Sequence, residues 1–266
     1  MNLPDCQELL LSEDAGVLTI TLNRPHKRNA MNSASVDEIM SVVEAVSDQR
    51  SIRALVFRGA EGNFCAGGDI SGMNLESQDD GKDASWHFNR SFGHLISKVN
   101  RAPQVVICLL EGAVLGGGFG LACISDVAIA ERNAMFAMPE TGLGILPAQI
   151  APFVVARIGL TQTRRLALLG ERVNGEEAQR LGVVHHVVDG ADGLSTKLQE
   201  TLKHLKRCAP AATAATKKLI LDTAMIADLD ALLDRASNDF AEAITSPEGQ
   251  EGTRAFVEKR KPQWAL

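Results

Sequence analysis

Two glycine-rich stretches and one carboxylate carry the residue types with which this sequence could do chemistry. The stretch Leu115-Gly116-Gly117-Gly118-Phe119-Gly120 follows an apolar run that reads as a buried strand, and residues 121–123 can open a helix. Glycines at such a junction let bare backbone N–H groups approach a ligand, and a helix start adds a positive dipole end. This turn suits a phosphate or an oxyanion, although alone it equally describes a tight structural junction.

An earlier stretch has a similar design. Phe64-Cys65-Ala66-Gly67-Gly68-Asp69 follows the short apolar strand at 55–57, so two turns at two strand ends could each donate one N–H to a single oxygen. A third piece, residues 136–144, places Glu140 in apolar, glycine-rich surroundings. Without further support, Glu140 reads more readily as a capping acid than as a catalytic one.

Motifs along the whole chain join these pieces in a recognisable order. They are Asn23-Arg24-Pro25, Asn29-Ala30-Met31, residues 64–69, residues 112–118, Pro139-Glu140 and residues 256–260. Together they resemble the crotonase family, also called the enoyl-CoA hydratase/isomerase family. The set of motifs is highly specific for the family and much less specific for the reaction.

The resemblance implies an α/β fold, a crotonase-like spiral of ββα repeats followed by a C-terminal helical region. Residues 1–200 would form the core with the active site, and residues 201–266 would serve trimerisation and closure over coenzyme A. The implied assembly is a homotrimer, or a homohexamer of two trimers. The implied substrate is an acyl-CoA thioester, with coenzyme A as part of the substrate and no permanently bound cofactor.

The resemblance also assigns roles to particular residues. The backbone N–H groups of Ala66 and Gly117 would bind the thioester oxygen, and Glu140 would hold a water molecule or move a proton. Phe256 and Lys259 would reach the adenine end of coenzyme A, often from a neighbouring subunit. The full set of implied coenzyme A contacts is Lys27, Arg28, Ala30, Gly68, Asp69, Phe256 and Lys259.

The chain departs from the family pattern at Gly120, where standard hydratases carry a second glutamate. Either Glu140 acts alone, or another acid such as Glu111 or Asp69 takes part. A single acid also suits a Δ3,Δ2-enoyl-CoA isomerase, in which one base moves a proton between C2 and C4. A hydratase that adds water across the C2–C3 double bond is the leading interpretation, and the isomerase is the alternative.

The stretch at 144–159 points to a branch within the family. It is similar to bacterial methylglutaconyl-CoA and isohexenylglutaconyl-CoA hydratases of leucine and acyclic-terpene breakdown, whose substrates carry a branch and a carboxylate. The space left at Gly120 would accept such a branch, with Gln149 in the same acyl pocket. Trp86, Phe88 and Phe92 could line that pocket, although core packing is the more common use of such residues.

Composition narrows the function classes. With 266 residues, 45% of them hydrophobic, the chain can bury a substantial core, and a net charge of −6 argues against nucleic acid as a partner. Five scattered cysteines favour a reduced, cytoplasmic protein, and no metal-ligand spacing occurs. No apolar run reaches the ~20 residues of a membrane span. A non-catalytic binding subunit is a further alternative, disfavoured by the negative charge and by Glu140.

Hydrophobic periodicity predicts strands in the first half and helices after Glu140. A polar, acidic stretch at 72–83 reads as a mobile loop that could close over a substrate. A pair at His185-His186 is not accompanied by a G-x-S-x-G nucleophile motif, so a Ser-His-Asp hydrolase is a weak alternative. The predicted strands are 7–12, 17–22, 54–57, 105–110 and 127–130, and the predicted helices are 33–48, 83–100, 150–158, 161–169, 175–181, 191–207, 211–224, 228–244 and 247–259.

Overall fold

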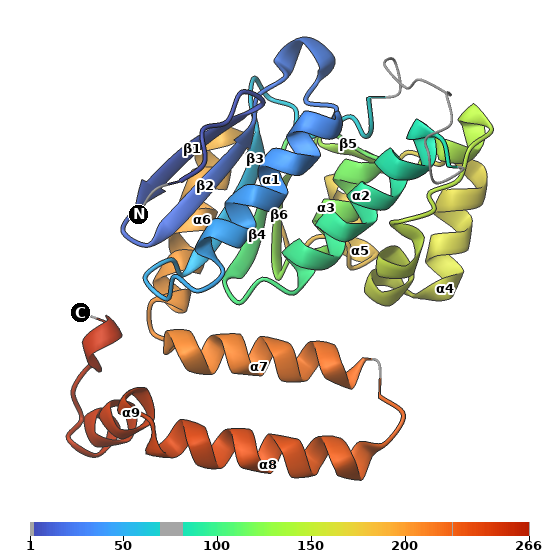
Figure 1. The fold of residues 1–266 in the computed structure, drawn as a ribbon. Helices are drawn as coiled ribbons and strands as arrows, with labels where there is room; N and C mark the ends of the chain where they lie inside the picture. Colours follow the sequence, from blue (N-terminus) through green and yellow to red (C-terminus); the bar gives the residue numbers. More distant parts are fainter. Residues whose placement is uncertain (1–2, 70–81, 225, 266) are drawn as a thin grey trace.

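The computed structural model of the chain describes residues 3–69, 82–224 and 226–265. Figure 1 shows an α/β body that contains most of the chain and a group of C-terminal helices beneath it. The loop predicted at 72–83 lies outside the described residues, apart from Lys82 and Asp83. Among the described residues, no helix combines the length and the apolar character needed to cross a bilayer.

A six-stranded sheet forms the centre of the α/β body. Its order is β1-β2-β3-β4-β6-β8, with an antiparallel hairpin at β1–β2 and parallel pairing from β2 onward. The five predicted strands are confirmed to within a few residues, and β8 is an addition. The strands are β1 (Leu9–Asp14), β2 (Val17–Leu22), β3 (Ala54–Gly59), β4 (Val105–Leu110), β6 (Val127–Glu131) and β8 (His186–Val188).

A ββα repeat organises the chain around this sheet. Strand β4 leads into a short strand β5 (Ala113–Leu115) and helix α3 (Gly117–Ile124), and β6 leads likewise into β7 (Met135–Ala137) and helix α4 (Ala151–Leu169). Strands β5 and β7 pair in a second small sheet. Isolated bridges Met31–Gly68 and Cys65–Val114 extend that layer toward the earlier turns of the spiral. The predicted crotonase-like spiral is therefore confirmed.

Helices cover both faces of the main sheet, as a largely parallel sheet requires. Helices α1 (Ser33–Val46) and α2 (Ala84–Asn100), with α3, pack on one face, and α6 (Gly190–Leu205) packs on the other (Figure 1). Because side chains alternate along a strand, Leu55 and Phe57 of β3 belong to the first core, and Ala54 and Val56 belong to the second.

The helix boundaries follow from local chemistry. Asn32 accepts the Ser35 N–H at the start of α1, and Asp83 accepts the Trp86 N–H at the start of α2, both at 2.8 Å. Within α4 the backbone breaks at Gly159, where φ is 76°. The two helices predicted at 150–158 and 161–169 correspond to the segments on either side of this kink. The remaining short elements are η1 (Pro25–Lys27), η3 (Glu140–Leu143), α5 (Gly175–Arg180) and η4 (Gln263–Ala265).

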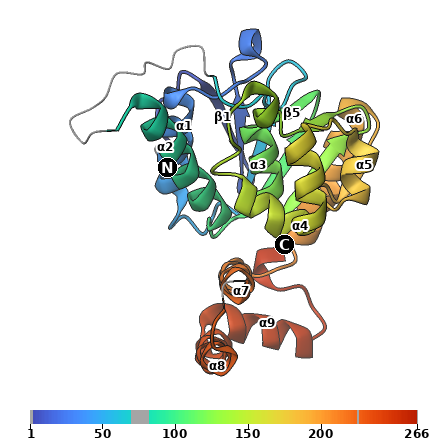
Figure 2. The ribbon, with the colours of Figure 1, turned by 90° about the vertical axis from the view of Figure 1, so that its right-hand side faces the viewer.

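The C-terminal helices stand apart from the α/β body. Figures 1 and 2 show α7 (Pro210–Thr223), α8 (Leu229–Thr245) and α9 (Pro247–Val257) below it, reached through the segment that follows α6. Helix α6 itself lies on the main sheet through Leu194, Leu202 and Leu205. The boundary predicted at residue 200 falls inside α6, and the separate helices begin with α7.

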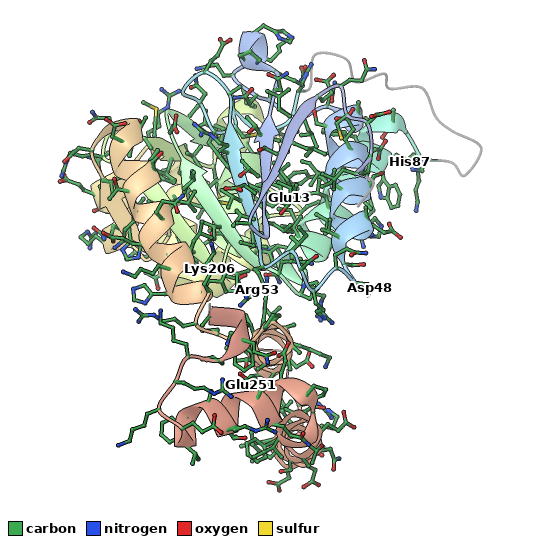
Figure 3. All side chains as sticks on the ribbon, turned by 90° about the vertical axis from the view of Figure 1, so that its left-hand side faces the viewer. Glu13, Asp48, Arg53, His87, Lys206 and Glu251 are labelled. Carbon is green, nitrogen blue, oxygen red and sulfur yellow. The ribbon has the colours of Figure 1, made fainter. Side chains whose placement is uncertain are left out.

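Polar contacts fasten the C-terminal helices to the body. Lys217 of α7 donates to Asp126 at 2.6 Å and to the Gln104 carbonyl at 3.1 Å, with its side chain only 10% exposed. Arg53 donates to the carbonyl groups of Leu205 and Cys208 at the same junction, which Figure 3 shows beside Lys206. The junction is therefore held mainly by charged donors and backbone acceptors.

Candidate active site

The two glycine-rich turns and Glu140 meet at one pocket of about 160 Å³. The residues that line it come from the first turn, from the start of α2, from the β5–α3 junction and from η3 with the segment that follows. Apart from the backbone of the turns, the lining is mostly apolar. It comprises Ala66, Gly67, Gly68, Phe88, Asn89, Phe92, Gly116, Gly117, Pro139, Glu140, Leu143, Ile145, Leu146, Pro147, Ala148, Gln149 and Ile150.

The second-layer pairing brings the turns side by side. The Leu115 N–H donates to the Cys65 carbonyl at 2.9 Å, and a Cβ placed on Gly67 would lie 3.4 Å from the Leu115 carbonyl oxygen. Gly67 has φ of +106° and Gly116 has φ of +51°, a region in which side-chain-bearing residues are strained. Glycine at these two positions therefore permits both the backbone conformation and the close approach of the turns.

The N–H groups available at the turns are those of Gly68 and Gly117. Met31 pairs with both neighbours of Gly68, through Gly67 and Asp69, so the Gly68 N–H points away from that bridge. Gly117 is the first residue of α3 and has no intrahelical acceptor. Neither N–H has an acceptor among the residues that the structure describes, and both residues line the pocket.

This geometry corrects the predicted first donor. The Ala66 N–H donates to the Arg28 carbonyl at 3.0 Å and is therefore not available to a ligand oxygen. Among the described residues, the first turn instead offers the N–H of Gly68, which the sequence had placed among the coenzyme A contacts. Gly117 keeps its predicted place. The hydrogen bond of Ala66 instead ties the turn to the loop that carries Lys27 and Arg28.

Glu140 supplies the single carboxylate among the described residues that line the pocket. A Cβ placed on Gly116 would lie 3.0 Å from Glu140 Oε1, so the acid is immediately beside the second turn. The other oxygen, Oε2, is buried and has no hydrogen-bond partner among the residues that the structure describes. Burial raises the pKa of the Glu140 carboxyl above its ordinary value, while a hydrogen bond to its own backbone opposes the shift. A half-buried acid of this kind is suited to exchange a proton with a ligand.

The expectation that Gly120 leaves room for an acyl branch is wrong. Gly120 is buried in α3, and a Cβ placed on it would lie 2.4 Å from Ile150 Cγ2 and 3.5 Å from Ile96 Cδ1. Gly120 is not part of the pocket lining, whereas Ile150 is. The volume of a side chain at position 120 is thus occupied by Ile150, an apolar residue that the sequence did not single out.

The two reserve acids do not reach the pocket lining. Glu111 is 8% exposed and lies 3.4 Å from Arg58, and burial raises the pKa of its carboxyl. Asp69 accepts from Arg24 at 2.9 Å and lies 3.8 Å from Lys27. Both acids are held by basic side chains, which leaves Glu140 alone among the acids considered from the sequence.

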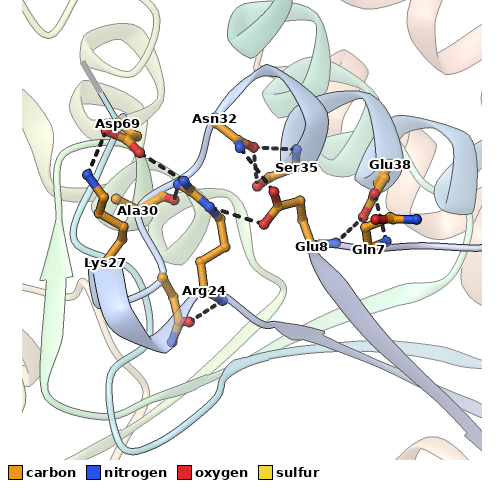
Figure 4. A network of polar contacts seen from close by, with 10 residues as sticks. Gln7, Glu8, Arg24, Lys27, Ala30, Asn32, Ser35, Glu38 and Asp69 are labelled. Atoms are coloured by element: carbon orange, nitrogen blue, oxygen red, sulfur yellow. Dashed lines mark hydrogen bonds and ion pairs between the residues drawn. The ribbon is translucent and has the colours of Figure 1, made fainter. Parts of the chain in front are cut away.

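The polar loop beside the first turn is fixed by an ion-pair network, drawn in Figure 4. Arg24 binds Glu8 at 3.1 Å and Asp69 at 2.9 Å and also donates to the Ala30 carbonyl at 2.5 Å. Lys27 and Arg28 are exposed at the edge of this network. The network holds Ala30 and Asp69 in structural roles, and contact of these residues with coenzyme A stays a prediction.

The start of α2 contributes one side of the pocket. Phe88 and Phe92 line it, although core packing was the favoured interpretation of these aromatic residues, whereas Trp86 is 43% exposed and is not part of the lining. Gln149, from the segment before α4, also lines it. Gln149 donates to Asn89 at 2.9 Å, a polar neighbour that the sequence analysis missed. The sequence did contain a signal for this residue, because Asn89 lies between two aromatic residues and four residues before the buried Gly93.

Phe256 and Lys259 lie at the end of α9 and do not line the pocket. Phe256 is 85% exposed and Val257 is 78% exposed. Large apolar side chains at such exposure are typical of surfaces that another molecule covers. Phe256 and Lys259 end or follow the C-terminal helices, which lie below the α/β body in Figure 2.

The histidine pair has a structural role. His185 Nδ1 accepts the Ala128 N–H at 2.9 Å, and Arg157 lies beside the same ring. Burial lowers the pKa of His185, so its neutral form is favoured. No group of three potential metal ligands occurs in the described part of the chain. The Ser-His-Asp alternative receives no support from these contacts.

Comparisons with known proteins agree with the site. The family model described as "Enoyl-CoA hydratase/isomerase" matches residues 12–265. The chain belongs to this family. Two relatives come from Escherichia coli K12, a 1,2-epoxyphenylacetyl-CoA isomerase and a 2,3-dehydroadipyl-CoA hydratase. Each is 31% identical to this chain, over 97% of this chain and 98% of the relative. The solved structure of Pseudomonas aeruginosa AtuE is 58% identical, with a TM-score of 0.93, over 98% of this chain and all of that one.

These family members include both hydratases and isomerases by name. The chain is accordingly an enzyme of the enoyl-CoA hydratase type, and its relatives place it in acyl-CoA metabolism. Family membership fixes neither the acyl chain nor the choice between hydration and isomerisation, because the members share one scaffold. That choice rests on the chemistry of the pocket.

Proposed function

We propose that this enzyme adds water across the C2–C3 double bond of an enoyl-CoA thioester. The observation that carries the proposal is the meeting of two N–H groups, from Gly68 and Gly117, that have no acceptor among the described residues, with the half-buried carboxyl of Glu140 in one pocket. Two preorganised donors stabilise the negative charge that develops on the thioester oxygen, and removal of one such donor typically costs about 3–4 kcal/mol.

Glu140 would then handle both proton transfers. As a carboxylate it takes a proton from the water that attacks C3, and the enolate oxygen is held by the two N–H groups. As a carboxylic acid it returns a proton to C2. A pKa raised by burial favours this exchange, because each form of the acid lies closer in free energy to the other at neutral pH.

We infer further that the acyl chain is branched or carries a carboxylate. The support is the likeness of residues 144–159 to glutaconyl-type hydratases and the name of the 2,3-dehydroadipyl-CoA relative, since an adipyl chain ends in a carboxylate. The apolar lining beyond Glu140 suits the hydrocarbon part of such a chain. Because Ile150 fills the space at Gly120, a branch would have to lie elsewhere in the pocket.

A Δ3,Δ2-enoyl-CoA isomerase is the second candidate. The observation that favours it is the lone carboxylate, since Gly120 and Ile150 leave no second acid in the described lining. Isomerisation needs one base that moves a proton between C2 and C4. The non-catalytic binding subunit gains no comparable observation.

Mass spectrometry separates the two reactions. The enzyme is incubated with straight-chain, branched and carboxylated enoyl-CoA esters, including glutaconyl-type esters and 3-enoyl esters. A hydratase product gains the mass of one water, whereas an isomerase product keeps its mass and changes its retention time. Glu140→Gln serves as the matched inactive control. Isomerisation without any water gain would replace the hydratase proposal with its alternative.

We also propose a homotrimer or homohexamer in which coenzyme A is enclosed by the C-terminal helices. Exposed Leu233 and Phe240 of α8 and Phe256 of α9 provide apolar surface for such contacts. Lys27, Arg28 and Lys259 supply the cations for the phosphates of coenzyme A, which is part of the substrate. A cytoplasmic location, without nucleic-acid or membrane partners, stays a prediction. Light scattering measures the assembly, and a monomer at micromolar concentration would contradict it.

A further inference from the structure

A polar cluster lies in the otherwise apolar part of the pocket. Besides Glu140, Asn89 and Gln149 are the polar side chains among the described lining residues. Gln149 Nε2 donates to Asn89 Oδ1 at 2.9 Å, and Arg90 Nη1 donates to Gln149 Oε1 at 3.5 Å. The second distance is at the limit for a hydrogen bond, so the Arg90 contact is the more adjustable of the two.

Arg90 fixes which atoms donate and which accept the hydrogen bonds in this cluster. A guanidinium only donates, so Gln149 must turn its carbonyl oxygen toward Arg90 and its NH₂ group toward Asn89. Asn89 in turn must present its carbonyl to Gln149, which leaves its own NH₂ group as the end of the chain. That NH₂ group has no acceptor within the described part of the protein. The cluster therefore ends in a donor at the pocket.

Arg90 also has no acidic partner in the part of the chain that the structure describes. Within residues 3–69, 82–224 and 226–265, no carboxylate lies within 4.0 Å of its guanidinium. An arginine beside a mostly apolar pocket, without an acidic partner, favours an anion there over a neutral oxygen. The ligand group that satisfies both the free NH₂ donor and the positive charge is a carboxylate.

Gly93 shows that the chain makes room for this cluster. It lies in the buried interior of α2, where glycine is a poor helix former. A Cβ placed on Gly93 would lie 1.9 Å from Gln149 Oε1 and 2.8 Å from Arg90 Nη1. The Gln149 carboxamide thus occupies the space that a methyl group on residue 93 would fill. A methyl group there would have to displace Gln149.

We propose that Asn89, Gln149 and Arg90 recognise a carboxylate on the acyl chain of the thioester, with Asn89 as the contacting donor and Arg90 as a positioning residue. The inference rests on the proposed function only in taking an acyl-CoA thioester as the ligand. It places the part of the pocket that selects a carboxylate at the start of α2. The segment at 143–148, by contrast, lines the pocket with apolar side chains.

Binding of saturated thioesters tests the proposal without any reaction. Isothermal titration calorimetry compares succinyl-, glutaryl- and adipyl-CoA with butyryl-, pentanoyl- and hexanoyl-CoA, which match them in carbon number. We expect the wild-type enzyme to bind at least one carboxylated ester more tightly than its partner. Asn89→Ala and Arg90→Leu are expected to reduce that ratio roughly 10-fold or more, as for loss of a hydrogen bond to a charged group.

Three further variants sharpen the result. Gly93→Ala should lower the same ratio while α2 stays helical, because its methyl group displaces Gln149 rather than backbone. Arg90→Lys should retain part of the preference. Arg101→Leu, which removes the same charge from the other end of α2, should leave the ratio unchanged. Circular dichroism of each variant checks that it is folded.

The outcomes are decisive in either direction. Equal affinity of the wild-type enzyme for both members of all three pairs would overturn the inference, as would a preference that survives both Asn89→Ala and Arg90→Leu. Equal weakening of all six esters would assign the cluster to general structure and overturn it too. Hydration measured separately by water gain tells failure of this inference from failure of the proposed function.

Discussion

At the scale of single residues, the position of Glu140 links activity to stability. Its Oε2 atom is buried with no partner in residues 3–69, 82–224 and 226–265, and burial raises the pKa of the Glu140 carboxyl. A carboxyl whose pKa is higher in the folded state than in the unfolded state contributes stability at low pH. That contribution is lost as the pH rises through the folded-state value. The ionised acid is therefore a cost to the fold at the pH where the enzyme works.

Glu140→Gln should separate these two effects. Loss of the general acid–base group is expected to lower kcat by about 10²- to 10⁴-fold. The neutral amide avoids the cost of a buried charge, so the variant should unfold at a higher temperature than the wild type at pH 8. That advantage should narrow as the pH falls to 5. Calorimetry at a fixed protein concentration and initial rates check both parts, and an unchanged rate would remove Glu140 from the mechanism.

The choice between Ala66 and Gly68 as donor also belongs to this scale. Replacing the residue at 68 with glycolic acid turns its amide into an ester and removes the N–H while keeping every side chain. We expect kcat to fall about 10²- to 10³-fold, as for loss of one oxyanion donor. Lactic acid at position 66 is the matched control.

That control should leave kcat within a few-fold of the wild type, because the Ala66 N–H serves the Arg28 carbonyl. It should lower stability instead, by about 0.5–1.5 kcal/mol for one hydrogen bond. The reverse pattern, with a large rate loss at 66 and none at 68, would restore the assignment made from the sequence.

At the scale of elements, α3 and the start of α4 pack against each other at the position where standard hydratases carry a second acid. Ile150 lies where a side chain on Gly120 would go. Gly120→Ala should therefore overpack the core and destabilise the protein by about 1–3 kcal/mol. In an Ile150→Ala background, the same substitution should cost much less, since the Cγ2 atom at 2.4 Å is then gone and only the alanine Cβ, at 3.0 Å, remains.

Urea unfolding of the four proteins in this cycle measures the coupling between the two positions. Protein concentration must be the same throughout, because assembly contributes to stability. Additive effects of the two substitutions would mean that Ile150 does not fill the space at Gly120. Gly142→Ala is a suitable control, since a Cβ there meets no atom within 4 Å.

The elements themselves were largely predictable, because the apolar runs of β3 and β4 and the kink at Gly159 are local signals. The meeting of the two turns with Glu140 was anticipated through the family motifs. The exact donor was not, because the bond from Ala66 to Arg28 joins segments far apart in sequence. The sequence analysis missed Ile150 and Asn89 for the same reason. Only the packing of the folded chain brings Ile150 to α3 and Asn89 to Gln149.

At the scale of the whole molecule, the C-terminal helices depend on a few contacts with the body. Lys217 is largely buried, and burial lowers its pKa, while Asp126 opposes that shift. Asp126 also accepts the Val106 N–H at 2.7 Å, so it would keep one partner without Lys217. The Lys217–Asp126 pair thus joins α7 to the start of β4.

Lys217→Met should loosen this junction at a cost of up to about 3 kcal/mol. We expect limited proteolysis between α6 and α7 to become several-fold faster, with the α/β body left intact. Lys218→Met is the matched control, since Lys218 is an exposed residue that pairs within α7 with Asp222. Equal cleavage rates in the two variants would show that the apolar surface of α7, and not the ion pair, holds the junction.

The tight fit of Ile150 against Gly120 has a consequence for the evolution of this enzyme. A codon change that introduced glutamate at position 120 would drive its first side-chain carbon into Ile150, and the protein would lose stability before it gained a second acid. The order of substitutions is therefore constrained, and residue 150 has to become smaller first. A lineage with isoleucine at 150 is held in the one-acid state by its own packing, whatever benefit a second acid would bring.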